Sequence, residues 1–238
     1  MTTQPPKESN RFRLPIQKNS QTLAIFAIVC TAIVGLVNEL TSDKIKAQEQ
    51  LQLLNTLHSI IEPNRYNNDI TQDCVSLSST LLGNSANDKE VHTAYIARQD
   101  NQVIAIAMTS TAPDGYNGNI ELIIAINMDN TVSGVRVLKH QETPGLGDKV
   151  ELRKSNWIES FTGEKLLSEN DIRWAVTKDH GMFDQFTGAT ITPRAVVKAV
   201  RKTLLYFKDN KKSLLTRPNI CLNESKSAQI TSEVNNEH

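Results

Sequence analysis

The sequence predicts an α+β protein in which a single N-terminal transmembrane helix precedes a domain built from an antiparallel sheet and helices. Three observations lead to this prediction. An apolar, charge-free stretch lies near the N-terminus, strand-like alternation dominates the middle of the chain, and a helical pattern follows it. Because the strands precede the helices instead of alternating with them, the pattern favours an α+β fold over a repeating βα fold.

The composition limits the classes of function that the chain can serve. Its 238 residues allow one domain of ordinary size with appendages. The 26 basic and 26 acidic residues balance and form no basic stripe, so we expect no nucleic-acid partner. No Cys-x-x-Cys pair occurs, and the five histidines lack metal-binding spacing, so we expect neither an iron–sulfur cluster nor a metal site.

The N-terminal apolar stretch predicts a membrane anchor. Residues 22–37 carry no charge, and residues 20–40 reach the length of about 20 residues that a crossing needs. A cleaved signal peptide is the main alternative, but no Ala-x-Ala site closes the stretch. A buried core helix would seldom lack a polar face altogether. We therefore expect an uncleaved transmembrane helix over residues 20–40.

The charges that flank this helix predict its orientation. Residues 1–19 hold four basic residues against the single acid Glu8, whereas acidic and basic residues are mixed after Leu40. The positive-inside rule then places residues 1–19, a polar segment, in the cytoplasm. Everything after Leu40 is expected to face the periplasm, and the protein is expected in the inner (plasma) membrane.

A second helical pattern begins at Ser42 and stops at Pro63, with apolar residues at Ile45, Leu51, Leu54, Leu57 and Ile61. We interpret it as a stalk that continues from the membrane, within a stalk and lead-in segment over residues 41–90. A coiled-coil contact with another chain is the alternative, although the pattern covers few heptads.

From Val91 the apolar period changes to two, which is typical of strands. Four segments rich in β-branched residues are separated by turn residues, namely His92–Ala97, Val103–Thr109, Ile120–Asn127 and Val132–Leu138. Short turns between consecutive strands favour antiparallel pairing. The sequence therefore predicts an antiparallel meander.

Helices are expected to complete a domain over residues 91–207. We expect one helix over about residues 150–160, a short strand near 173–177, and a final helix that ends near Phe207. Thr192 followed by Pro193 is typical of a helix start, with the threonine as N-cap. Residues 208–238 are expected to form a polar tail.

Two short segments near this final helix suggest a binding site. In residues 140–148, Pro144 fixes one torsion and two glycines allow close backbone approach, so the loop suits a flat ring. Residues 184–190 place a hydroxyl, that of Thr190, just before the positive end of the final helix, which favours a phosphate. The alternatives are an ordinary turn and a merely capped helix.

The second segment resembles the flavinylation motif of the FMN-binding domain family, in which the last threonine carries FMN through a phosphoester bond. The resemblance implies Thr190 as the acceptor and assigns Asp184, Thr187, Gly188 and Ala189 to the same motif. Residues 140–148 resemble the Glu-Thr-Pro-Gly-Leu-Gly stretch of that family. This match implies further cofactor-binding residues, namely Glu142, Thr143, Gly145, Leu146 and Gly147.

With the membrane anchor, the resemblance points to the G subunits of Rnf-type ion-translocating electron-transport complexes. It implies a flavoprotein subunit that relays electrons through FMN without stand-alone catalysis, and no catalytic residue is assigned. The implied partners are the other membrane subunits and the flavin transferase that attaches FMN. Alternatives are the C subunit of a sodium-translocating NADH:quinone reductase, a membrane-tethered flavin redox sensor, and a scaffold that is never modified.

Several residues near these motifs remain open to two interpretations. Cys74 and Cys221 would both face an oxidising compartment and are equally compatible with a disulfide and with two free thiols. Residues 140–148 are called the glycine loop below. His140, at its start, would either touch a bound ring or serve as an ordinary loop residue. Tyr116 lies in a Gly-Tyr-x-Gly stretch that also resembles the family, but we interpret it as a packing residue.

Overall fold

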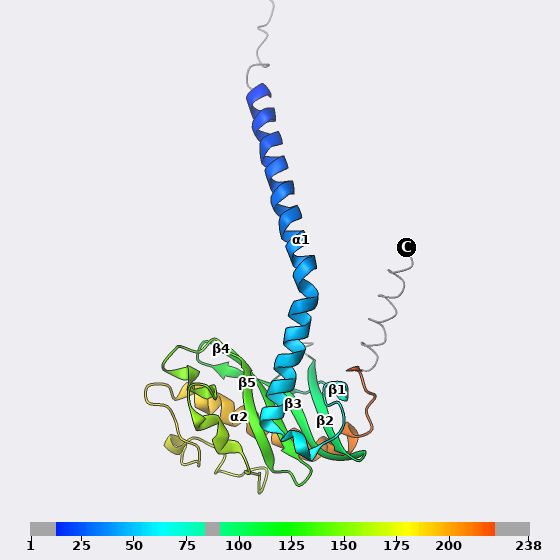
Figure 1. Cartoon of the computed structure of the whole chain (residues 1–238). Helices are drawn as coiled ribbons and strands as arrows, with labels where there is room; N and C mark the ends of the chain where they lie inside the picture. Colours follow the sequence, from blue (N-terminus) through cyan, green and yellow to red (C-terminus); the bar gives the residue numbers. More distant parts are fainter. Residues whose placement is uncertain (1–12, 84–90, 222–238) are drawn as a thin grey trace, which may run out of the picture. The chain divides into compact units, whose positions relative to one another are not determined.

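A computed structural model describes residues 13–83 and 91–221 (Figure 1). The chain divides into two compact units, residues 1–51 and residues 52–238. The long helix α1 (Arg13–Ile60) supplies the described part of the first unit and the beginning of the second. Residues 1–12 of the expected polar segment and residues 222–238 of the expected tail lie outside the described residues.

The first unit holds the expected transmembrane helix. Residues Asn19–Ser42 are long and apolar enough to cross a membrane, the one such helix in the part of the chain that the structure describes. The large apolar side chains of this stretch are exposed, from 49% at Val29 to 69% at Leu23. The helix begins at Arg13, before the expected start at Ser20, and it continues into the expected stalk without a break.

The second unit contains a five-stranded antiparallel sheet in the order β1-β2-β3-β4-β5, which confirms the predicted meander. Its strands are β1 (Cys74–Leu77), β2 (His92–Gln99), β3 (Gln102–Gly115), β4 (Gly118–Asn127) and β5 (Val132–Lys139). Strand β1 was not predicted, since its four residues are too few to show a period. With the helices this sheet confirms the predicted α+β class.

Alternation along the strands supplies two apolar faces. On one face, Ile106 and Met108 of β3 are fully buried in the main core together with α2 (Ile191–Leu214). On the other face, Ala105 and Ala107 are buried against the end of α1. Continuous burial is expected for a sheet covered on both sides, because successive side chains enter opposite cores.

The last turns of α1 therefore belong to the domain rather than to a free stalk. Leu57, Ile60 and Ile61 are buried against small alanine side chains of the sheet. The helix end is also held by polar contacts, because Ser133 Oγ donates to the Ile60 carbonyl (2.6 Å) and Arg136 Nη2 to that of Ser59 (3.0 Å). Side-chain donors at a helix C-terminus satisfy carbonyls that have no partner within the helix.

Two predictions for the chain after the sheet are wrong. The predicted helix over residues 150–160 is replaced by two 3-10 helices, η3 (Gly147–Val150) and η4 (Asn156–Phe161). Ser155 between them is extended, with φ −163°, and its hydroxyl accepts from Trp157 N, so the chain restarts instead of continuing. The predicted strand near 173–177 is a series of bends that makes a single bridge, Val176 with Phe183, before η5 (Thr177–Asp179).

The final helix α2 is longer than predicted. It runs to Leu214, whose side chain is fully buried, whereas the predicted end was near Phe207. Its apolar stripe is confirmed, since Val196, Val200 and Leu204 are all buried.

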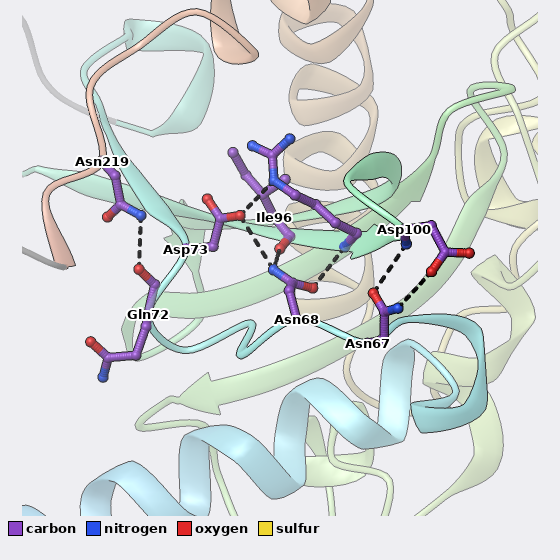
Figure 2. Close-up of polar contacts among 8 residues, drawn as sticks. Asn67, Asn68, Gln72, Asp73, Ile96, Asp100 and Asn219 are labelled. Atoms are coloured by element: carbon purple, nitrogen blue, oxygen red, sulfur yellow. Dashed lines mark hydrogen bonds and ion pairs between the residues drawn. The ribbon is translucent and has the colours of Figure 1, made fainter.

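The segment between α1 and β1 is fastened to the sheet by polar side chains (Figure 2). It includes η1 (Pro63–Arg65), and η2 (Thr80–Leu82) follows β1. Asn68 Nδ2 donates to the Ile96 carbonyl (2.9 Å), and its Oδ1 accepts from Arg98 N (2.8 Å). Arg98 also pairs with Asp73 at 2.6 Å.

The chain beyond α2 returns to β1. Cys74 and Cys221 form a disulfide with a Cα–Cα distance of 5.6 Å, which decides between the two alternatives left open by the sequence. Ile220 N donates to the Cys74 carbonyl (3.0 Å), and Arg217 Nη1 donates to that of Ser76 (2.8 Å). Asn219 Nδ2 reaches the Gln72 carbonyl at 2.8 Å (Figure 2).

Candidate functional site

A cavity of about 290 Å³ lies where the β3–β4 turn, the glycine loop and the N-terminus of α2 meet. Its lining combines hydroxyls, one carboxylate, backbone and apolar side chains. The residues that line it are Tyr116, Glu142, Thr143, Leu146, Gly147, Gly188, Ala189, Thr190, Ile191 and Thr192.

The cavity brings together most of the site residues proposed from the sequence. Both motifs contribute, although they lie far apart in the chain. Three of the proposed residues, Gly145, Thr187 and Asp184, do not line it. All three are exposed. Asp184 supports the motif through its backbone, since its carbonyl accepts from Trp157 Nε1 at 2.7 Å.

The glycine loop is closed by hydrogen bonds to a single carbonyl. The Thr143 oxygen accepts from the amides of Leu146 and Gly147, each at 3.1 Å. Gly145 has φ +79°, a left-handed conformation that favours glycine. This tight turn leaves the Leu146 side chain 43% exposed at the mouth of the cavity.

Glu142 lies beneath this loop and is only 5% exposed. Its Oε2 accepts from the Thr192 hydroxyl at 2.5 Å, and its Oε1 accepts from the Asn117 amide at 3.2 Å. Two glycines leave room for the carboxylate, because a Cβ on Gly147 would lie 2.6 Å from Oε2 and one on Gly115 2.9 Å from Oε1. The carboxylate thus contacts all three segments that form the cavity.

Thr190 occupies the N-cap position of α2. Its backbone is helical (φ −83°, ψ −26°), and its side chain makes no capping hydrogen bond. The predicted N-cap, Thr192, is wrong, because the helix begins at Ile191 and the Thr192 hydroxyl points to Glu142 instead. Gly188, with φ +81°, turns the chain into this position.

The start of α2 carries a partial positive charge that favours an anion, with the buried Glu142 carboxylate beside it. The first turn of the helix contains no acidic residue, so its unpaired amides and the positive end of its dipole are not neutralised from within. Two acids lie nearby: Glu142 accepts from the Thr192 hydroxyl, and Asp179 is held by Arg194, which donates to both of its oxygens at 2.5 and 2.6 Å. These hydrogen bonds lower the pKa of Asp179.

His140 supports the loop rather than the cavity. Its Nδ1 accepts from the Glu142 amide at 3.0 Å, and its Nε2 lies 2.5 Å from Glu151 Oε1. The hydrogen bond from Arg153, followed by that from His140, lowers the pKa of Glu151. Since His140 does not line the cavity, the interpretation as a loop histidine is the one that the structure favours.

These residues fit a flavin mononucleotide. The hydroxyl of Thr190 and the start of α2 suit its phosphate. The exposed apolar side chains at the rim, Tyr116, Leu146 and Ile191, suit a flat ring. Sequence reasoning set Tyr116 aside and missed Ile191. The Gly-Tyr-x-Gly stretch was the signal that pointed to Tyr116, which is 64% exposed and therefore not a packing residue.

Two other features of the described residues carry no predicted chemistry. A cavity of about 530 Å³ near the end of α1 contains none of the proposed site residues. No group of three or more His, Cys, Asp or Glu side chains within residues 13–83 and 91–221 is arranged to hold a metal ion.

Two family models match the chain. The model of the FMN-binding domain matches residues 115–205, which include every segment that lines the cavity. The model of the RnfG N-terminal region matches residues 9–60, which include the apolar helix. The fold and the site thus define an FMN-binding-domain protein with an N-terminal membrane helix.

Highly similar relatives specify the family further. The chain is 51% identical over 207 residues to the G subunit of the ion-translocating oxidoreductase complex of Shewanella loihica, and the match covers 87% of this chain and 96% of that protein. The G subunit from Shewanella oneidensis is 50% identical over 209 residues (87% and 96%), and that from Vibrio cholerae 49% over 206 residues (87% and 97%). The chain belongs to this family of G subunits, which confirms the resemblance found in the sequence.

Proposed function

We propose that this protein is the subunit of an ion-translocating oxidoreductase complex that relays electrons through FMN bound covalently to Thr190. In the proposed linkage, Thr190 Oγ1 loses its proton and bonds to the FMN phosphorus of a flavin dinucleotide donor. The P–O bond of the donor's diphosphate breaks, the second nucleotide leaves as its monophosphate with the proton, and the protein gains the mass of FMN minus one water. FMN bound there would supply the redox chemistry, taking electrons from one partner and passing them to another.

One observation carries this proposal. The two motifs that resemble the flavin family meet at a single cavity, and Thr190 lies in it at the start of α2 with its hydroxyl not used as a cap. A phosphate at this position is stabilised by the helix dipole and by unpaired amides. A threonine in the middle of a helix would offer neither.

The remaining residues of the two motifs would position the cofactor. The backbone of Gly188 and Ala189 brings the chain to Thr190, and Asp184 and Thr187 shape the turn before it. Glu142, Thr143 and Gly147 form the floor of the cavity, and Gly145 turns the loop so that Leu146 lies at its mouth. None of these residues has to exchange a proton, so we propose no stand-alone catalysis for the chain.

The membrane anchor would keep this carrier within the complex. We propose an N-terminus in the cytoplasm, a helix across the inner membrane, and a periplasmic FMN-binding domain, with the segment boundaries given by the sequence. The basic residues of segment 1–19 and the Cys74–Cys221 disulfide support this orientation. Protease added to the outside of spheroplasts should digest the domain, and full protection of the domain would contradict this orientation.

Partners follow from the same proposal. The other membrane subunits would donate and accept the electrons, and a flavin transferase would attach FMN to Thr190. The names of the relatives favour the G-subunit assignment over the C subunit of a sodium-translocating quinone reductase.

Intact mass of the protein purified from its own host tests the linkage. We expect an added FMN minus water, mapped to the peptide that contains Thr190, and a fluorescent band in a denaturing gel. Thr190→Ala should abolish both signals, whereas the control Thr162→Ala, at an exposed threonine outside both motifs and outside the cavity, should leave Thr190 modified. An unmodified wild-type chain, or a fluorescent Thr190→Ala band, would overturn the proposal.

A further inference from the structure

The side chain of Thr192 joins α2 to the glycine loop. Its hydroxyl is buried, with 1% of the residue exposed, and donates to Glu142 Oε2 at 2.5 Å. The two residues are 50 positions apart in the chain. Because Thr192 is the second residue of α2, this hydrogen bond fixes the first turn of the helix, directly after Thr190, against the loop.

Glu142 is held on its other side by the β3–β4 turn. The backbone amide of Asn117 donates to Glu142 Oε1 at 3.2 Å, and the side-chain Nδ2 of Asn117 donates to Thr143 Oγ1, also at 3.2 Å. Among the described residues no basic side chain forms an ion pair with Glu142 within 4.0 Å. The Glu142 carboxylate is therefore stabilised by hydrogen bonds from neutral donors. Loss of one donor would leave one of its buried oxygens without a hydrogen bond.

We propose that Glu142 and Thr192 are positioning residues for the modification of Thr190. The carboxylate ties the start of α2 to the loop, so that the Thr190 hydroxyl is presented in the cavity when the flavin transferase acts. This inference rests on the proposed attachment of FMN to Thr190. Neither residue exchanges atoms with the cofactor; the new bond joins Thr190 Oγ to phosphorus, as described above.

Thr192→Val provides the main test, because valine keeps the shape of threonine and removes the hydroxyl. The measured quantity is the initial rate at which the purified full-length apoprotein gains FMN from a flavin transferase and its flavin donor, followed by intact mass. We expect Thr192→Val to slow the rate by about tenfold or more. Thr192→Ser, which keeps the donor, should restore the rate to within about threefold of wild type.

The same helix offers a matched control. Thr203 is also fully buried in α2, but its hydroxyl donates to the Ala199 carbonyl (2.9 Å) one turn earlier, away from the cavity. Thr203→Val thus makes the same chemical change in the same helix, and Thr190 in this variant should be modified at the wild-type rate. Hydrogen exchange should quicken at the first turn of α2 in Thr192→Val and not in Thr203→Val.

The outcomes separate this inference from the proposed function. A wild-type rate in Thr192→Val, or an equal slowing in Thr203→Val, would overturn the positioning role while leaving Thr190 as the acceptor. A wild-type protein that never gains FMN would instead remove the proposed function itself. Circular dichroism of each variant establishes that the compared proteins are folded.

Discussion

Gly134 of β5 lies directly against Ile60 at the end of α1, so closely that a Cβ on Gly134 would be 2.9 Å from the Cβ of Ile60. Small residues in the sheet let the helix approach, since the four alanines that face it, Ala97, Ala105, Ala107 and Ala125, are all fully buried. The end of α1 is therefore fitted to this face of the sheet.

Replacement of Gly134 by alanine should force α1 away from β5. Overpacking of this kind lowers the free energy of unfolding by about 1–3 kcal/mol. Urea unfolding of the full-length protein in detergent, followed by tryptophan fluorescence, measures the change. An unchanged urea midpoint would contradict the prediction, because it would show that the end of α1 moves with no loss of unfolding free energy.

The glycine loop allows a prediction about coupling. Gly147→Ala would place a Cβ 2.6 Å from Oε2 of Glu142, whereas at Gly145 no atom lies within 4 Å and only the positive φ opposes a side chain. We expect Gly147→Ala to lower the free energy of unfolding by about 1–3 kcal/mol and Gly145→Ala by about 1 kcal/mol.

A double-mutant cycle distinguishes the two causes. In a Glu142→Ala background the cost of Gly147→Ala should fall, because its main obstacle is gone, while the cost of Gly145→Ala should stay the same. Equal behaviour of the two glycines in both backgrounds would contradict the steric explanation.

The disulfide joins residues that are 147 positions apart, so it restricts the unfolded chain strongly. Replacing Cys74 and Cys221 by serine should cost about 2–5 kcal/mol of unfolding free energy. Denaturant unfolding with and without dithiothreitol measures this loss of unfolding free energy. The reductant should destabilise the wild type and leave the stability of the double variant unchanged. Two free thiols in the non-reducing mass of the native protein would contradict the bridge.

Acid stability should depend on Asp171. Arg173 donates to both of its oxygens, at 3.0 and 2.8 Å, and these hydrogen bonds lower the pKa of Asp171 from 3.8 to about 2. A carboxyl group whose pKa is depressed by folding stabilises the fold above its unfolded pKa, and this contribution is lost as the pH falls from about 4 to about 2.

The contribution of Asp171 is measured by comparing the unfolding free energies of the wild type and Asp171→Asn across this pH range. The wild type should exceed the variant by about 1–2 kcal/mol at pH 5, with the difference shrinking toward pH 2. The Arg173 side chain is 41% exposed, and solvent screening therefore keeps the difference in unfolding free energy below that expected from the full change in the pKa of Asp171. A difference that does not change with pH would exclude the ion pair as its source.

The sequence predicted those parts of the fold that follow a simple period. The strands of the meander are runs of β-branched and other apolar residues between turn residues, and α2 carries one apolar stripe, so both were recognised. The prediction of a helix over residues 150–160 was wrong because Val150 and Ile158 are apolar for a different reason. They pack onto the core from two separate 3-10 helices, and the extended Ser155 breaks the chain between them.

The candidate site was predicted from motifs, and its geometry was not. Sequence spacing brought out Thr190 and the glycine loop, but it could not show that Thr192 turns inward to a carboxylate 50 residues earlier in the chain. Nor could it show that Asp184 supports the turn through its carbonyl. Contacts between distant segments depend on the tertiary fold, which leaves no period in the sequence.

The return of the chain to β1 affects how copies of the domain meet one another. A terminal strand of a sheet offers unpaired amides and carbonyls that can recruit a strand from a neighbouring molecule. Here Arg217 and Ile220 occupy carbonyls of β1, and the disulfide keeps this cover in place. Neighbouring copies of the domain thus have little opportunity for edge-to-edge aggregation at this strand.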